Sequence, residues 1–258
     1  MALHSKPKVL LIDELSLGLA PAVVERILPV IKQIADQGTA VIIVEQSVNL
    51  ALTIADRAYF MEKGQIRFDG STKELLNRPD LLRSVFLSNT PISASETSSK
   101  PSTKESKTIL EIEDMTRSFG GILAVSSVTF DVRSNEIIGI MGPNGAGKTT
   151  LFDLLSGFVP SQGGSIKLLG QDITTKSPAE RSKLGLGRSF QDARLFPSLT
   201  VAEAIAVALE RFTSAKNPIS GALHLPHVSR SEKEIRKQVN DLIELMGLRA
   251  YENKFISE

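Results

Sequence analysis

The chain has 258 residues, of which 41% are hydrophobic and 23% charged, and its formal net charge is +1. These values are typical of a globular protein and exclude a strong electrostatic attraction to nucleic acid or to an anionic membrane. Because the chain contains no cysteine, it has neither disulfides nor thiolate metal sites. No apolar run approaches the roughly 20 residues that cross a bilayer, so direct membrane insertion is not expected.

The first 88 residues alternate strand and helix patterns. Val9–Asp13 and Ala40–Glu45 are short apolar runs that end in an acidic residue, and Pro21 opens a helical pattern that Gly38 closes. Two further short apolar runs flank Lys63-Gly64 and predict a hairpin. This alternation favours a mostly parallel sheet with covering helices.

The clearest boundary is the stretch from Ser88 to Lys107, which is rich in Ser, Thr, Pro and Lys. Such a composition buries too little apolar surface to offset the entropy of ordering, which favours a flexible linker over an ordered loop. The sequence therefore divides into a first segment (residues 1–88), a linker (residues 89–107) and a second segment (residues 108–258).

In the second segment the pattern changes from strands to helices. Strands are expected at Ile109–Glu113, Val125–Val132, Glu136–Met141 and Gly164–Leu169. Helical periodicity follows at Val201–Glu210 and Glu232–Met246, with an irregular stretch between them, Thr213–Val228. That stretch contains His224 and His227, but two histidines without further ligands predict a solvated loop rather than a metal site.

The stretch GPNGAGKT from Gly142 to Thr149 fits the pattern G-x-x-x-x-G-K-[ST]. Its glycines allow backbone N–H groups to approach phosphate oxygens closely, and the helix predicted to begin at Lys148 presents its N-terminus to the anion. Lys148 offers a positive charge to the β- and γ-phosphates, and Thr149 offers a hydroxyl to Mg²⁺. Because the motif follows a predicted buried strand, we expect a phosphate-binding loop.

Asp13 and Glu14 stand at the end of another predicted buried strand. One carboxylate in this place can hold Mg²⁺, and a second can orient an attacking water molecule. An acidic strand end is more often a turn residue or a helix cap, so the pair gains meaning only beside a phosphate-binding loop.

Taken together, these motifs resemble those of the ATP-binding-cassette (ABC) transporter ATPases, and among them the ATPase subunits of branched-chain amino-acid importers. In the second segment the resemblance rests on ILEIEDMTRSFGGILAVSSVTFDV, on the phosphate loop and on GRSFQDARLFPSLTVAEAI. In the first segment it rests on VLLIDE, SLGLAP and VIIVEQSVNLALTIADRAYFMEKGQI. It covers nearly everything outside the linker.

The resemblance implies a fold and a set of site residues. The fold is an α/β, P-loop NTPase (ABC ATPase-like) core with a mostly parallel sheet, an antiparallel β part and a truncated helical subdomain. Catalytic roles would fall to Glu14, Lys148 and Gln46, and metal contacts to Thr149, Gln191 and Asp13. Contacts with ATP would come from Phe119, Val125, Gly142, Pro143, Asn144, Gly145, Ala146, Gly147, Lys148, Thr149, Thr150 and Gln191.

Three departures from the family pattern stand out. Gln46 occupies the switch position where the family usually has histidine, and Leu15 replaces the proline that usually follows the acidic pair. The glycine-rich signature motif is absent, and the chain ends at Glu258, about where that motif is expected to begin. We therefore expect the back half of one cassette joined to the front half of the next, as in a truncated tandem protein or a permuted one.

Each segment lacks a part that the other one has. The first has the acidic strand but no phosphate loop, and the second has the phosphate loop but no acidic strand. A linker of about 20 residues spans roughly 25 Å on average, which is enough for the segments to dock within one molecule. We therefore expect a composite core in which Asp13 and Glu14 lie beside Lys148 and Thr149.

The resemblance implies an ATP-binding, ATP-hydrolysing energy-coupling subunit of an importer for branched-chain amino acids or similar small polar solutes. Its partners would be transmembrane permease subunits and a second cassette, and its place the cytoplasmic face of the cell membrane. The alternative is a truncated or permuted module that binds nucleotide without turnover, because the signature motif is missing. A different phosphate-loop enzyme, such as a kinase, is disfavoured because no acceptor-substrate motif is visible.

Overall fold

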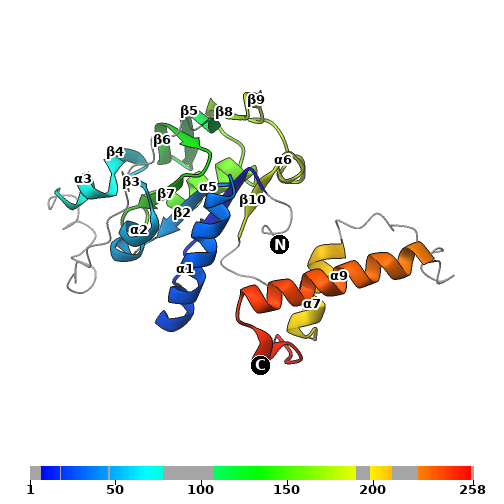
Figure 1. Cartoon of the computed structure of the whole chain (residues 1–258). Coiled ribbons are helices and arrows are strands. Elements are labelled where there is room, and N and C mark those ends of the chain that lie inside the picture. Colours follow the sequence, from blue (N-terminus) through cyan, green and yellow to red (C-terminus); the bar gives the residue numbers. More distant parts are fainter. Residues whose placement is uncertain are drawn as a thin grey trace. The chain divides into compact units, whose positions relative to one another are not determined.

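The computed structural model describes residues 7–17, 19–45, 47–77, 107–189, 198–210 and 226–256 (Figure 1). These residues fall into two compact units, one formed by the described residues up to 189 and one by those from 198 onward. The boundary between the two compact units therefore lies inside the second segment. Residues 78–106, which include most of the predicted linker (residues 89–107), lie outside the described residues.

The larger unit contains elements from both segments. The first segment forms β1 (Val9–Asp13), α1 (Pro21–Asp36), β2 (Ala40–Glu45), α2 (Val48–Ile54), β3 (Arg57–Glu62), β4 (Gln65–Ser71) and α3 (Thr72–Leu76). The second segment adds β5 (Thr108–Phe119), β6 (Ile122–Arg133), β7 (Ile137–Met141), α5 (Lys148–Ser156), β8 (Gly163–Leu168), β9 (Gln171–Asp172), α6 (Pro178–Leu184) and β10 (Leu186–Arg188).

Strands of both segments alternate within one six-stranded sheet of order β10-β1-β2-β7-β3-β4. Strand β7 of the second segment lies between β2 and β3 of the first, parallel to both, with Gly139 opposite Ile43 and Ala58. Strand β10 of the second segment forms one edge of the sheet, where it pairs in parallel with β1 of the first segment. The expected docking of the two segments is therefore seen as interleaved strands, and the first five strands of this order run in parallel.

Strands β1, β2 and β7 are buried along their whole length because both faces of the sheet are covered there. On one face, Leu10, Ile12, Val41 and Ile43 pack with Ile31 and Ala35 of α1, and on the other Leu11, Ile42 and Ile140 pack with Leu151 and Leu155 of α5. Side chains of a strand alternate between faces, which explains the split between neighbouring residues. Figure 1 shows α1 as the blue helix beside these strands.

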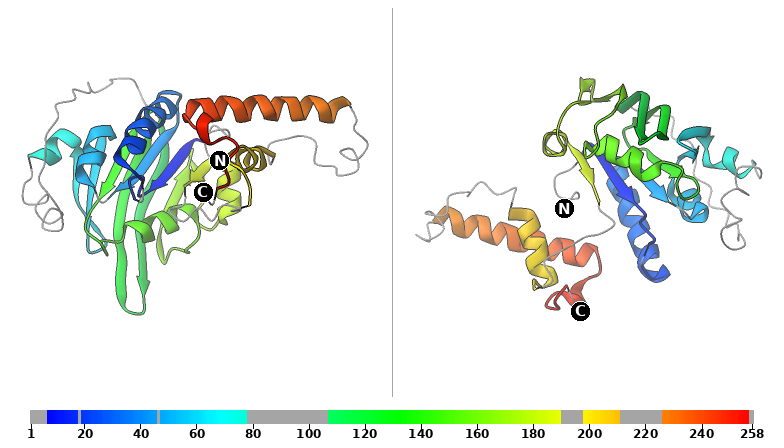
Figure 2. Two further views of the ribbon diagram at one scale, coloured as in Figure 1. Left: turned by 90° about the horizontal axis from the view of Figure 1, so that it is seen from below. Right: turned by 180° about the vertical axis from the view of Figure 1, so that it is seen from behind.

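A second, antiparallel sheet has the order β6-β5-β8-β9. Its buried side chains, such as Leu110, Ile112 and Val128, belong to the same hydrophobic cluster as Leu151 of α5. Helix α5 is thus enclosed between the two sheets. Strands β5 and β6 form the long green hairpin in Figure 2, and the expected mostly parallel core with an antiparallel part is confirmed.

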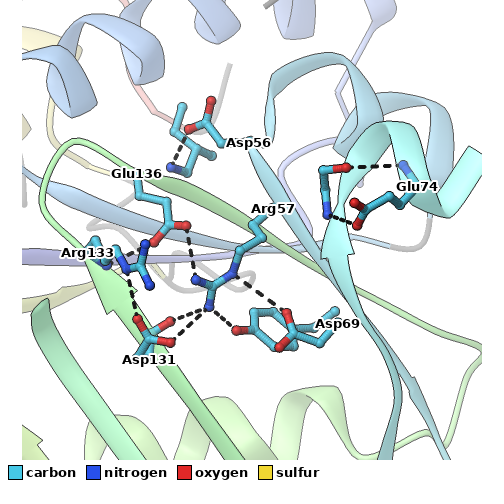
Figure 3. Close-up of polar contacts among 10 residues, drawn as sticks. Asp56, Arg57, Asp69, Glu74, Asp131, Arg133 and Glu136 are labelled. Atoms are coloured by element: carbon cyan, nitrogen blue, oxygen red, sulfur yellow. Dashed lines mark hydrogen bonds and ion pairs between the residues drawn. The ribbon is translucent and has the colours of Figure 1, made fainter. Parts of the chain in front are cut away.

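An arginine of the first segment joins the two segments at the start of β3 (Figure 3). The Arg57 guanidinium lies 3.3 Å from Asp131 of β6, 3.5 Å from Glu136 before β7 and 3.7 Å from Asp69 of β4. It also donates to the Asp131 carbonyl oxygen at 2.8 Å and to the Tyr59 hydroxyl. These interactions connect β3 and β4 to two elements of the second segment.

Helix α5 has a defined boundary at each end. It begins after Gly147 and ends at Gly157, and both glycines have left-handed backbone conformations. The buried Arg181 donates to the carbonyl oxygens of Leu154 at 2.6 Å and Leu155 at 2.7 Å. These carbonyls lie in the last turn, where Leu154 also accepts the Gly157 N–H at 3.2 Å, so Arg181 helps to satisfy the carboxyl end of the helix.

The smaller unit consists of α7 (Val201–Glu210), α9 (Pro226–Leu245) and the 3-10 turn Arg249–Tyr251. Leu209 packs against Val239 and Ile243 in a small cluster between the two helices. Helix α9 begins at Pro226, so residues 226–228 of the stretch expected to be irregular are helical, which proline at the first helical position favours. Among the described residues, no helix is both long and apolar enough to cross a membrane.

Candidate functional site

The candidate site lies at one edge of the six-stranded sheet. Because β1, β2, β7 and β3 are parallel, their carboxyl ends meet at the same edge. Asp13 at the end of β1 is opposite Val44, and Glu45 at the end of β2 is opposite Met141, the last residue of β7. The acidic strand of the first segment and the glycine-rich loop after β7 are therefore neighbours.

The glycine-rich loop (residues 142–147) has the backbone conformations that the motif predicts. Gly145 has a φ of 77° and Gly147, which precedes α5, has a φ of 100°. L-residues with a Cβ rarely adopt these angles, so glycine is required at both positions. The loop leads directly into the first turn of α5, where unpaired N–H groups and the helix dipole attract an anion.

Lys148 is the buried cation of the site. It is 5% exposed, and its Nζ donates to the carbonyl oxygens of Gly142 at 2.7 Å and Pro143 at 3.0 Å. Burial lowers the pKa of the Lys148 ammonium, while the negative charges of Glu14, Asp13 and Glu45 oppose this change. All three carboxylates belong to the first segment, so the predicted neighbourhood of Lys148 and the acidic pair is present.

Asp13 is held by an arginine for which the sequence predicted no role. Its Oδ2 lies 3.3 Å from Nη2 of Arg188, whose Nη1 contacts Asp153 of α5 at 2.6 Å. Burial raises the pKa of the Asp13 carboxyl, which Arg188 opposes. The other oxygen, Oδ1, is buried and has no hydrogen-bond partner within the described residues. Arg188 thus ties the acidic strand to the helix that follows the loop.

Glu14 and Glu45 shape the chain after the acidic strand. Glu14 has a left-handed backbone with a φ of 47°, and its N–H donates to the Val44 carbonyl oxygen at 2.9 Å. The Glu45 carboxylate accepts the Ser16 N–H at 3.0 Å and the Ser16 hydroxyl at 2.9 Å. Glu45 therefore fixes the turn after Glu14. The only feature of the sequence that pointed to this contact was the acidic residue Glu45 at the end of the predicted strand Ala40–Glu45.

Glu45 gives a testable pH dependence. Burial raises the pKa of its carboxyl above the ordinary value of 4.5. Between 4.5 and this raised pKa the folded chain binds more protons at Glu45 than the unfolded chain, so the residue favours folding as the pH falls into that window. We expect Glu45→Gln to change the pH dependence of the unfolding free energy. Relative to the wild type, the variant should lose stability as the pH falls from 7 to 5, which urea denaturation measures.

The matched control for this experiment is Glu25→Gln, since Glu25 is an exposed residue of α1. This variant should keep the wild-type dependence of stability on pH. An unchanged dependence in Glu45→Gln would contradict the assignment.

The remaining predicted residues occupy different surroundings. Thr149, Asn144 and Gly145 are exposed around the loop, whereas Val125 is fully buried in the core. Phe119 near the tip of the β5–β6 hairpin is 44% exposed, and the Arg117 guanidinium stacks 4.6 Å from its ring centre. The predicted residues Gln46 and Gln191 lie outside the described residues.

This arrangement suits a phosphate anion with a divalent cation. The glycine-rich loop and the start of α5 supply N–H groups, and Lys148 supplies a positive charge. The exposed hydroxyl of Thr149 and the unpartnered Oδ1 of Asp13 are hard oxygen donors of the kind that Mg²⁺ or its bound water prefers. The residues present therefore fit an Mg²⁺–nucleotide complex.

Comparison with known proteins shows which family the chain is similar to. Residues 125–258, just over half of the chain, match the ABC transporter family. A curated relative is the high-affinity branched-chain amino acid transport ATP-binding protein BraF of Pseudomonas aeruginosa, which is 36% identical over 149 residues. That match covers 58% of this chain and 58% of BraF, so the chain spans less than two thirds of the length of this relative.

A second relative matches a longer part of the chain. A putative ABC transporter ATP-binding protein of Methanosarcina acetivorans is 30% identical over 198 residues, which are 76% of this chain and 37% of that protein. Neither segment alone holds 198 residues, so the match includes parts of both. A solved nucleotide-free ATP-binding cassette from an ABC transporter is 26% identical, with 59% of each chain covered and a TM-score of 0.46.

Proposed function

The chain belongs to the ABC transporter family, and from this premise we propose that it binds Mg-ATP at a composite site built by both segments. The observation that carries the proposal is the position of β7 between β2 and β3. This order brings Lys148 of the second segment within electrostatic reach of Asp13, Glu14 and Glu45 of the first. A P-loop site for a nucleoside triphosphate uses a lysine for the phosphates and an acidic residue for the accompanying Mg²⁺.

Each residue of the site has a proposed task. The glycine-rich loop and Lys148 bind the β- and γ-phosphates, and Phe119 stacks on the adenine ring. Thr149, Gln191 and Asp13 would hold Mg²⁺ with their oxygen atoms, directly or through water. Mg²⁺, when bound with ATP, would neutralise charge on the phosphate oxygens. The other loop residues and Thr150 line the nucleotide, whereas the predicted contact of Val125 is left out because its side chain is fully buried in the core.

We further propose that the site hydrolyses ATP. Glu14 orients a water molecule and accepts its proton as the water oxygen attacks the γ-phosphorus and the bond to the β–γ bridging oxygen breaks. Gln46 donates a hydrogen bond to the γ-phosphate, and Lys148 stabilises the charge that develops on it. The products are ADP and inorganic phosphate. The contact between Glu45 and Ser16 supports this step because it holds the turn after Glu14 in place.

The alternative is a module that binds nucleotide without turnover, and the variant Glu14→Gln separates the two. We expect the wild type to bind Mg-ATP and release phosphate. The variant should bind with an affinity within about threefold of the wild type but release phosphate at least ~100-fold more slowly, because general-base assistance is lost. Calorimetry measures the binding, and a phosphate-release assay measures turnover.

Two results would change this account. Binding by the wild type without phosphate release would favour the non-hydrolytic module. Equal phosphate release by the wild type and Glu14→Gln would contradict the role of Glu14. The exposed variant Glu25→Gln serves as the control, and its turnover should equal that of the wild type.

The partners that we propose are transmembrane permease subunits and a second ATP-binding cassette, with the protein at the cytoplasmic face of the cell membrane. The coupled solute would be a branched-chain amino acid or a similar small polar molecule, as the name of BraF indicates for that relative. The match to the Methanosarcina protein supports an origin of the motif order at the junction of two successive cassettes, since it includes parts of both segments.

A further inference from the structure

A turn of the first segment contacts the glycine-rich loop through its backbone. In the 63–64 turn between β3 and β4, the N–H of Gly64 donates to the carbonyl oxygen of Ala146 at 2.9 Å. The carbonyl oxygen of Gly64 in turn accepts the N–H of Ser126 in β6 at 2.8 Å. The buried Gly64 thus connects the loop to the β5–β6 hairpin.

The packing at these contacts leaves no room for a side chain. A Cβ on Gly64 would lie 2.8 Å from the Ala124 carbonyl oxygen. A Cβ on Gly147 would overlap the same oxygen, and a Cβ on Gly142 would overlap the carbonyl oxygen of Met61 in β3. The backbone of the first segment therefore touches the glycine-rich loop near both of its ends.

The hydrogen bond to Ala146 has a consequence for the loop. A trans peptide is planar, with its C=O and N–H pointing in opposite directions. Holding the Ala146 C=O toward Gly64 therefore directs the N–H of Gly147 away from the turn. N–H groups of this loop are the proposed phosphate donors, so their direction decides how well an anion is bound.

We propose that Gly64 is a positioning residue that fixes the glycine-rich loop in its anion-binding conformation. The inference rests on the proposed function, because it assigns a task at the same nucleotide site. It places a determinant of phosphate binding in the first segment, far in sequence from the loop. Substitution of Gly64 should weaken nucleotide binding through the loop rather than through the general stability of the chain.

The chain contains a matched control for this test. The 169–170 turn between β8 and β9 has the same two-residue form, with φ values of 53° at Leu169 and 79° at Gly170, against 49° at Lys63 and 79° at Gly64. A Cβ on Gly170 would meet no atom within 4 Å. Gly64→Ala and Gly170→Ala therefore impose the same backbone strain, but only the first change disturbs the loop.

The first measurement is Mg-ATP affinity of the full-length chain by calorimetry. We expect Gly64→Ala to raise the Kd at least ~10-fold and Gly170→Ala to change it less than about twofold, because sub-ångström displacement of loop donors weakens every phosphate contact. Equal affinities of the two variants, with binding by the wild type, would overturn the inference. Absence of binding by the wild type would instead overturn the proposed function.

Hydrogen exchange without nucleotide tests the inference separately. Gly64→Ala should speed amide exchange in residues 142–150 and leave exchange in residues 163–172 unchanged. Gly170→Ala should speed exchange in residues 163–172 and leave exchange in residues 142–150 unchanged. If Gly64→Ala does not fold, a one-glycine insertion between Lys63 and Gly64 replaces it, with an insertion between Leu169 and Gly170 as its control. Loop exchange that is the same in both members of the pair would overturn the inference.

Discussion

Replacing Arg57 with methionine is expected to lower the free energy of unfolding by about 3 kcal/mol, because it removes the guanidinium that three carboxylates share. The side chain of Glu136 is 13% exposed, so its charge is the hardest to leave unpaired. Asp131 and Asp69 are 40% and 56% exposed and contribute less, since solvent screens exposed pairs. Urea denaturation followed by circular dichroism measures the change.

Arg133→Met is the control for this experiment. Arg133 also forms an ion pair with Asp131, but its side chain is 50% exposed and its loss should lower stability by less than about 1 kcal/mol. Figure 3 shows both arginines beside the same carboxylate. Equal effects of the two substitutions would contradict the assignment of Arg57 as the connection between the segments.

Replacing Lys148 with alanine is expected to weaken Mg-ATP binding at least ~100-fold, which corresponds to about 2.7 kcal/mol. The buried ammonium is the proposed cation for the β- and γ-phosphates, and its hydrogen bonds to phosphate oxygens are charge-assisted. Isothermal titration calorimetry on the full-length chain measures this loss.

The control for the lysine is Lys183→Ala, which removes an exposed lysine of α6. This variant should bind Mg-ATP with wild-type affinity. If Lys148→Ala also kept that affinity while the wild type bound saturably, the nucleotide would not occupy the glycine-rich loop.

Most strands of the larger unit could be predicted from local pattern. Continuous apolar runs such as Val9–Asp13 and Ala40–Glu45 have the strand bounds that the structure shows. The short helices α3 and α6 were not predicted, although the residue before each helix is a serine followed three residues later by glutamate. Both pairs form capping boxes, Ser71 with Glu74 and Ser177 with Glu180. Helices of one or two turns lack the length for a clear hydrophobic period.

The contacts that join distant parts of the site could not be predicted in the same way. The insertion of β7 between β2 and β3 depends on pairing over long sequence distances, for which a local pattern carries no information. The same holds for the ion pair of Asp13 with Arg188 and for the contact of Gly64 with Ala146. Complementary motifs predicted that the segments dock, but only packing determines which backbone groups meet.

The central claim is that residues of both segments form one nucleotide site, and hydrogen exchange with and without Mg-ATP tests it most directly. Exchange would take place in the full 258-residue chain, and mass spectrometry after digestion would follow peptides from both segments. We predict that Mg-ATP slows exchange in residues 142–150 of the second segment and also in residues 9–17 and 61–65 of the first. Slower exchange confined to the second segment would contradict the composite site.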